Sequence, residues 1–181
     1  MPWSTDFLPL AEWALRVQDL RHRYLYAPSA KRVLTSPGIA YAYETMASLA
    51  IFDAALGKGY VDGKTIWFEK PYPSVERNRA DLAFKDPGVG KPWAYIEIKH
   101  LSQMRAPLVR ADIEKLKAID RRAQRWLFVY GVHDGTKSKL ASALEAKFAS
   151  EIVSLQSSKF ETIHGDDDSN AVCELCLVRL R

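Results

Sequence analysis

Residues 93–100 read Trp-Ala-Tyr-Ile-Glu-Ile-Lys-His, and this stretch constrains the fold more than any other part of the chain. Residues two apart on a β-strand point to the same face. A strand here therefore places Tyr95, Glu97 and Lys99 on one face and a wholly apolar row on the other. Two charges beside a buried apolar row cost several kcal/mol unless they are paired or bind an ion, so the stretch also marks a candidate site. The apolar row consists of Ala94, Ile96 and Ile98.

An acid-x-lysine pattern occurs three times, at Asp62–Lys64, Glu97–Lys99 and Glu145–Lys147. The first pair flanks a turn glycine, which fixes no common face. The third pair falls on a predicted helix, where residues two apart diverge by about 200°. The second pair lies on the predicted strand, so its two charged side chains converge.

The composition is that of an ordinary globular domain. The chain has 181 residues, of which 48% are hydrophobic and 27% are charged, and we expect one domain spanning residues 1–181. No apolar run approaches the ~20 residues of a transmembrane helix, and the N-terminus lacks the pattern of a signal peptide. A cytoplasmic protein without membrane partners is therefore expected. The formal net charge of +4 permits a polyanionic partner without requiring one.

Periodicity and turn signals divide the chain into helices and strands. The first helix is expected to bury a face that includes Trp13 and Leu20, and Ser36 with Pro37 forms a start signal for the second helix. The element order predicts an α/β fold: a mixed central β-sheet flanked by helices on both sides, with two N-terminal helices. Helices are predicted at 8–26, 37–57, 107–123 and 137–155, and strands at 65–72, 79–84, 93–100, 125–133 and 171–180.

Two further carboxylates are predicted near the Glu97–Lys99 pair. Asp81 lies on the polar side of its strand, one hairpin upstream. Glu44 is the one charged residue in 37–52, and it either reaches solvent, pairs with an arginine or joins the site. Two carboxylates that approach closely repel unless a proton or a cation lies between them, and oxygen ligands suit Mg²⁺ or Mn²⁺. A neighbouring lysine can orient water, help to deprotonate it, or offset charge in the transition state.

These residues resemble the signature of the PD-(D/E)XK nuclease superfamily: Ala80-Asp81, then Glu97-Ile98-Lys99 after a turn, with Glu44 on the preceding helix. The resemblance covers residues 37–133 and implies a restriction-endonuclease-like core. It also implies a Mg²⁺-dependent endonuclease, with Mn²⁺ as a substitute, that hydrolyses phosphodiester bonds in DNA in preference to RNA. Ala80 departs from the family, which has a proline at this position.

The resemblance also implies a role for each matched residue. Asp81, Glu97 and the main-chain carbonyl of Ile98 would be metal ligands. Lys99 would be the catalytic lysine, and Glu44 would join the metal site through water. The expected catalytic set is therefore Lys99, Glu97, Asp81 and Glu44.

A basic segment after the candidate strand is consistent with a nucleic-acid partner. Residues 105–125 hold seven basic and three acidic residues, although a solvated helix face has a similar composition. Basic contacts of this kind position a phosphate backbone and carry little sequence information. A homodimer would bring two such sites to one duplex. The expected backbone contacts are Arg77, Arg79, Arg105, Arg110 and Lys115.

Two other functions remain open on the sequence. A catalytically silent nuclease-fold module could bind nucleic acid or a protein partner, for which the acidic loop at 165–170 and the modest charge leave room. A nucleotide hydrolase is disfavoured, because residues 57–65 match a P-loop only in part and lead into a strand rather than a helix.

The two cysteines are expected to be structural. Cys173 and Cys176 form a Cys-x-x-Cys pattern, and a zinc site would need about two further ligands. Their odd spacing sends them to opposite faces of the last strand, so we expect reduced core cysteines.

Overall fold

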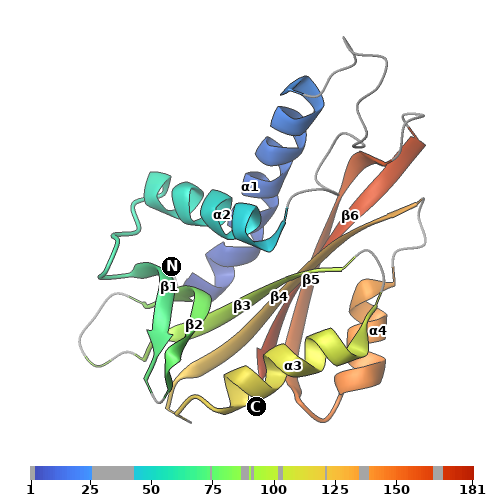
Figure 1. Ribbon diagram of the computed structural model, residues 1–181. Helices are drawn as coiled ribbons and strands as arrows, with labels where there is room; N and C mark the ends of the chain where they lie inside the picture. The colour runs from blue at the N-terminus through green and yellow to red at the C-terminus, as the bar shows by residue number, and fades with distance from the viewer. Residues whose placement is uncertain are drawn as a thin grey trace.

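The computed structural model describes residues 3–25, 43–73, 75–86, 90, 92–101, 104–120, 122–134, 139–164 and 169–181. These residues form an α/β fold with a six-stranded mixed sheet and four helices (Figure 1). None of these helices combines the length and the apolar character needed to cross a membrane. The elements are α1 (Trp3–Leu25), α2 (Glu44–Gly57), β1 (Ile66–Tyr72), β2 (Val75–Phe84), β3 (Ala94–His100), α3 (Ala106–Lys117), β4 (Gln124–Asp134), α4 (Leu140–Phe148), β5 (Ile152–His164) and β6 (Ser169–Leu180).

The strands lie in the order β1-β2-β3-β4-β6-β5. The first three form an antiparallel meander, whereas β4 runs parallel to β3, with α3 as the crossover between them. A parallel neighbour requires such a crossover, because a tight turn can join only antiparallel strands. The sheet is completed by β6 and β5, each antiparallel to its neighbour.

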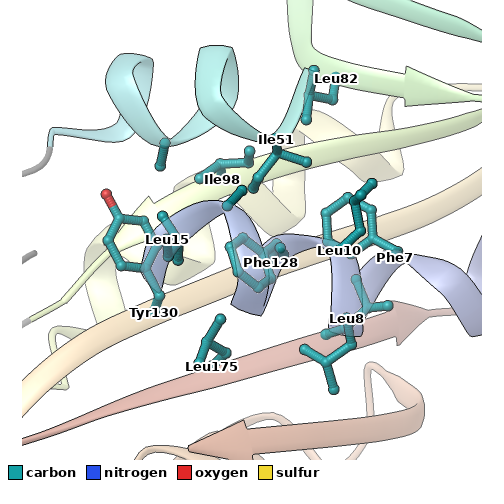
Figure 2. Close-up of a cluster of buried hydrophobic side chains, with 14 of the residues drawn as sticks. Phe7, Leu8, Leu10, Leu15, Ile51, Leu82, Ile98, Phe128, Tyr130 and Leu175 are labelled. Carbon is teal, nitrogen blue, oxygen red and sulfur yellow. The ribbon is translucent and has the colours of Figure 1, made fainter. Parts of the chain in front are cut away.

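Helices cover both faces of the sheet, as predicted. On one face α1 and α2 pack on the sheet through a core that includes Phe7, Ile51 and Phe128 (Figure 2). On the other face α3 and α4 pack through a second core that includes Val109 and Leu144. Burial of both faces explains why β4 is apolar almost without interruption over its central residues.

The predicted strand at 93–100 is confirmed as β3, with the predicted division of its faces. Ile96 and Ile98 belong to the core under α1 and α2, and Tyr95 belongs to the core under α3 and α4. The antiparallel hairpin with β2 is also confirmed, with Leu82 opposite Ile96. Just after β3, Leu101 comes so close to β4 that a Cβ on Gly131 would lie 1.8 Å from its carbonyl oxygen, so this position requires glycine.

The expected start of the second helix is wrong. Tyr43 has an extended backbone (φ −62°, ψ 159°), and α2 begins at Glu44. The proposed start signal, Ser36 and Pro37, lies outside the described residues. Glu44 is therefore the first residue of α2 rather than a residue of its interior.

The first and last predicted helices also need correction. Trp13 and Leu20 are 57% and 51% exposed on α1, although they were expected to be buried. The helix expected at 137–155 ends at Phe148, and β5 follows it from Ile152. The helical spacing of apolar residues continues into the start of β5. There β5 pairs with β6 along nearly all of its length, so sheet pairing outweighs this spacing.

The expectation for the cysteines is confirmed. Both are buried and unbridged, with Cys173 in the core under α1 and α2 and Cys176 in the core under α3 and α4. Burial raises the pKa of both thiols, which keeps them protonated and unreactive at neutral pH.

Candidate active site

The candidate site lies where the β2–β3 ladder ends. The paired residues run from Phe84 and Ala94 to Leu82 and Ile96. One residue further along β2, the carboxylate of Asp81 accepts a hydrogen bond from the backbone N–H of Ile98 at 2.6 Å. The Asp81 side chain thus accepts the hydrogen bond that a backbone carbonyl of β2 would accept in a regular ladder. This hydrogen bond holds the Asp81 carboxylate against β3.

Glu97 is almost completely buried, with 4% of its surface exposed. The hydroxyl of Tyr72 donates a hydrogen bond to one carboxylate oxygen, and the ammonium of Lys115 lies 3.5 Å from the other. Burial nevertheless raises the pKa of Glu97 to about 7, with help from the negative charges of Asp81 and Asp112. The two donors therefore compensate only part of the cost of removing this carboxylate from water.

The pKa of Asp81 is also set by opposing effects. Burial raises its pKa, and the nearby carboxylates of Glu44 and Asp112 add to the increase. The Ile98 N–H and the Lys115 ammonium act in the opposite direction without cancelling it. The structure thus places the two predicted ligand carboxylates in one electrostatic environment that disfavours their ionisation.

Lys99 is fixed between carboxylates that come from opposite sides of the sheet. Its ammonium lies 3.2 Å from Glu44 of α2 and 3.0 Å from Asp112 of α3. Burial lowers the pKa of Lys99, but these two carboxylates outweigh burial, so its pKa is raised. Lys99 is therefore an ammonium at neutral pH, suited to donate hydrogen bonds and positive charge rather than to accept a proton.

Glu44 joins this group rather than only facing solvent. In addition to the Lys99 contact, its carboxylate accepts a hydrogen bond from the backbone N–H of His100 at 3.1 Å. The partner is thus a lysine and a strand end, not the arginine considered on the sequence. Because α2 begins at Glu44, the first turn of this helix is tied to the end of β3.

Asp112 is a site residue that the sequence interpretation missed. It is 2% exposed, and its two oxygens lie 2.9 Å from the Lys115 ammonium and 3.0 Å from the Lys99 ammonium. A buried carboxylate thus fixes both lysines. The helical spacing of Val109, Asp112 and Leu116 could have revealed it, because this spacing places Asp112 on the buried face of α3.

Tyr72 is the second missed residue, and a backbone irregularity brings it to the site. Ile66 and Phe68 pack into the core under α1 and α2, and regular alternation would send Tyr72 to the same side. Glu69 has a φ of 49°, in the left-handed region. After it, Tyr72 belongs to the opposite core, where it reaches Glu97 and packs edge-on against Tyr95 at 5.7 Å between ring centroids.

The expected nucleic-acid contacts are divided by the structure. Lys115 lies within the carboxylate cluster, whereas Arg110 points elsewhere, 3.9 Å from Glu151 and over the ring of Phe148. Arg79 and Arg105 are exposed. The side chain of Arg77 lies outside the described residues.

The donor set of the candidate site consists of carboxylates rather than of a complete set of metal ligands. In the part of the chain that the structure describes, no three His, Cys, Asp or Glu side chains are arranged as a ready-made metal site. Asp81 and Glu97 nevertheless offer the oxygen ligands that Mg²⁺ and Mn²⁺ prefer. Both carboxylates have raised pKa values, and a nearby cation would favour their ionised forms. These two residues therefore fit a hard divalent cation, with the Ile98 carbonyl and Glu44 as the further donors expected from the sequence.

No family model, curated protein or solved structure matches this chain.

Proposed function

We propose that this chain is a metal-dependent nuclease that hydrolyses phosphodiester bonds, in DNA in preference to RNA. The observation that carries the proposal is that two largely buried carboxylates, Asp81 and Glu97, share one electrostatic environment with Asp112. Asp112 in turn holds the Lys99 ammonium at 3.0 Å. Burying two like charges is unfavourable without a function or a counter-charge that compensates for it. A divalent cation and a phosphodiester together would supply the positive charge and the substrate that such a site suits.

The element order supports the proposal. The chain passes from α2 through the antiparallel strands β1, β2 and β3 to α3 and the parallel strand β4. This is the helix–strand–hairpin–helix context in which the residue pattern resembled the PD-(D/E)XK superfamily. We therefore propose a restriction-endonuclease-like core within residues 44–134.

Each residue of the site has a distinct task in the proposed reaction. Asp81 and Glu97 would hold Mg²⁺, with the Ile98 carbonyl as a third donor and Glu44 acting through water. When bound, the ion would polarise the scissile phosphate and lower the pKa of a bound water. Tyr72 orients the Glu97 carboxylate through its hydroxyl.

Lys99 would act on the water or on the phosphate. Because its pKa is raised, it retains its proton at neutral pH and can orient the attacking water by hydrogen bonding. It can also offset the negative charge that develops on the phosphate oxygens. Asp112 keeps the ammonium in place at 3.0 Å and so acts as a positioning residue.

The decisive experiment is cleavage of plasmid DNA in Mg²⁺ by the wild-type protein and the Glu97→Gln, Asp81→Asn and Lys99→Met variants. Each variant should lose at least about 100-fold in cleavage rate, because each loses a ligand or a charge used in the transition state. Circular dichroism should show an unchanged fold.

Glu145→Gln is the matched control, because Glu145 belongs to the same acid-x-lysine pattern but is exposed on α4. It should cleave like the wild-type protein. Full cleavage by Glu97→Gln would refute the assignment of the active site.

A second candidate is a silent module with the same fold that binds nucleic acid or a protein. One observation favours it: Glu97 and Asp112 already have a counter-ion in the Lys115 ammonium. Calorimetric titration with Mn²⁺ separates the two functions. A nuclease requires a Mn²⁺ site that disappears in Glu97→Gln, whereas a silent module does not.

A further inference from the structure

A second concentration of charge lies away from the carboxylates, at the end of the sheet where β3 and β4 begin and β6 ends. A cavity of 1160 Å³ is formed there by the C-terminal end of α3, the turn that follows it and the adjoining strand ends. The charged side chains that line it are Lys117, Asp120, Arg122, Arg125, Arg179 and Arg181. We call this the arginine cavity.

The charges of the arginine cavity are poorly balanced. No Asp or Glu side chain of the described residues forms an ion pair with any of its four arginines. Asp120, the one acidic residue of the lining, accepts a hydrogen bond from the backbone N–H of Arg122. Lys117 is already engaged by Glu114 at 3.1 Å. The lining therefore carries an excess of basic over acidic side chains in a concave site.

Two of the arginines are held in fixed positions. Arg125 donates to the carbonyl oxygen of Arg181 at 2.9 Å and to that of Ile119 at 2.5 Å. The guanidinium of Arg179 lies over the ring of Trp126 at 6.0 Å. Contacts of this kind reduce the entropy lost when a guanidinium binds an anion, and the planar guanidinium group matches phosphate well.

The position of the cavity connects it with the proposed active site. Arg125 pairs with Tyr95 in the sheet, and Glu97 pairs with Leu127, two residues further along β4. Two strand residues span about 7 Å. The last turn of α3 links the two places directly, because it carries both Lys115, which contacts Glu97, and Lys117, which lines the cavity.

From this arrangement we infer that the arginine cavity binds backbone phosphates of the nucleic acid whose scissile phosphate lies at Asp81 and Glu97. The inference rests on the proposed function for the identity of the ligand. A chain of phosphates is favoured over one small anion, because the arginines come from three separate segments and the cavity is larger than one phosphate needs. The cavity thus anchors the substrate beside the site without reading its sequence.

The test is the salt dependence of duplex binding. Binding of a fluorescent 20-base-pair duplex to the wild-type protein in EDTA, where no cleavage occurs, is measured at several NaCl concentrations. Each lost phosphate contact should reduce the magnitude of the slope of log K against log[NaCl] by about 0.9. Arg122→Gln and Arg179→Gln should each reduce it by about one contact, and the double variant by about two.

Arg21→Gln is the matched control, because Arg21 is an exposed arginine on α1, which covers the opposite face of the sheet. Its slope should equal that of the wild-type protein. Arg122 is exposed, and its side chain has no partner in the described residues. The Arg122→Gln variant should therefore fold, and it keeps the test valid even if the double variant does not fold.

The outcomes separate this inference from the proposed function. An unchanged slope in both single variants overturns the inference, even if the wild-type protein cleaves DNA. Displacement of the duplex by millimolar inorganic phosphate at constant ionic strength also overturns it, because the cavity would then hold a small anion. A cavity-dependent slope without Mg²⁺-dependent cleavage would support the inference while refuting the proposed hydrolysis.

Discussion

Lys115 occupies a position that decides how the site behaves without a metal ion. Its ammonium contacts both Glu97 and Asp112, yet 46% of its side chain is exposed. It can therefore leave the carboxylates for solvent without rearrangement of the core. A divalent cation at the proposed site would therefore compete with Lys115 for the same negative charge. The predicted role of Lys115 as a phosphate contact is thus replaced by contacts with Glu97 and Asp112.

Replacement of Lys115 by Met should therefore tighten Mn²⁺ binding. A positive charge next to a cation site opposes the cation electrostatically, so its removal should lower the Kd for Mn²⁺ by about tenfold. Isothermal titration calorimetry measures this Kd directly.

Lys117→Met serves as the control, because Lys117 lies on the same turn of α3 but pairs with Glu114. Its Kd should stay at the wild-type value. Weaker Mn²⁺ binding by Lys115→Met would show that the lysine supports the cation site rather than competing with it.

At the scale of the element, β1 depends on one unusual backbone conformation. Glu69 adopts a positive φ that costs an L-amino acid roughly 1–2 kcal/mol, and glycine adopts it freely. This conformation and the register shift between Pro71 and Tyr72 precede the point at which Tyr72 faces Glu97. The conformational free energy spent at Glu69 thus accompanies the placement of Tyr72 in the candidate site.

Glu69→Gly should consequently stabilise the protein by about 1 kcal/mol in urea unfolding. Glu161→Gly is a suitable comparison, since Glu161 is also an exposed glutamate on an edge strand but has no positive φ. That variant should be destabilised by about 1 kcal/mol. Equal effects of the two substitutions would indicate that Glu69 stores no strain.

Elements with regular periodicity could be predicted from the sequence. The alternation along β3 predicted its burial. The convergence of Glu97 with Lys99 stays a prediction, because Lys99 contacts Glu44 and Asp112. Regions without such periodicity could not be predicted. The start of β5 contains Ser154, Gln156 and Ser157, which show no apolar alternation, so the preceding helical stripe was extended through it. The strand forms because β6 supplies partners along its length, and this information lies outside the segment.

Of the candidate site, the sequence predicted the residues whose direction follows from a regular element, namely Asp81, Glu97 and Lys99, and each of them lies near Asp112. Tyr72 was not predictable, because it follows two backbone irregularities that no pattern encodes: the positive φ of Glu69 and the register shift between Pro71 and Tyr72. Glu44 was recognised as an isolated charge, but its partners became clear only when α2 was seen to begin there.

At the scale of the whole molecule, the buried carboxylates make global stability depend on pH. The folded protein keeps a proton on Glu97 up to about pH 7, whereas the unfolded chain releases it near the ordinary value of 4.5. Between these values the folded state binds more protons, so stability falls as pH rises. The raised pKa of Asp81 acts in the same direction.

In EDTA the free energy of unfolding should therefore fall between pH 5 and pH 8 by roughly 2–3 kcal/mol more in the wild-type protein than in Glu97→Gln. Urea titrations at both pH values provide the measurement. Parallel pH profiles for the two proteins would contradict the raised pKa, and saturating Mn²⁺ should restore wild-type stability at pH 8 through binding to the folded state.

The ion pairs of Lys99 with Glu44 and Asp112 couple the candidate site to the folding of the molecule. One of the carboxylate partners of Lys99 comes from α2 on one side of the sheet and the other from α3 on the opposite side. The Lys99 ammonium is therefore held by both partners only after both helical layers have docked. A partly folded copy, or one with either layer detached, lacks a competent site. In the proposed nuclease, this arrangement would restrict cleavage to molecules that have completed folding.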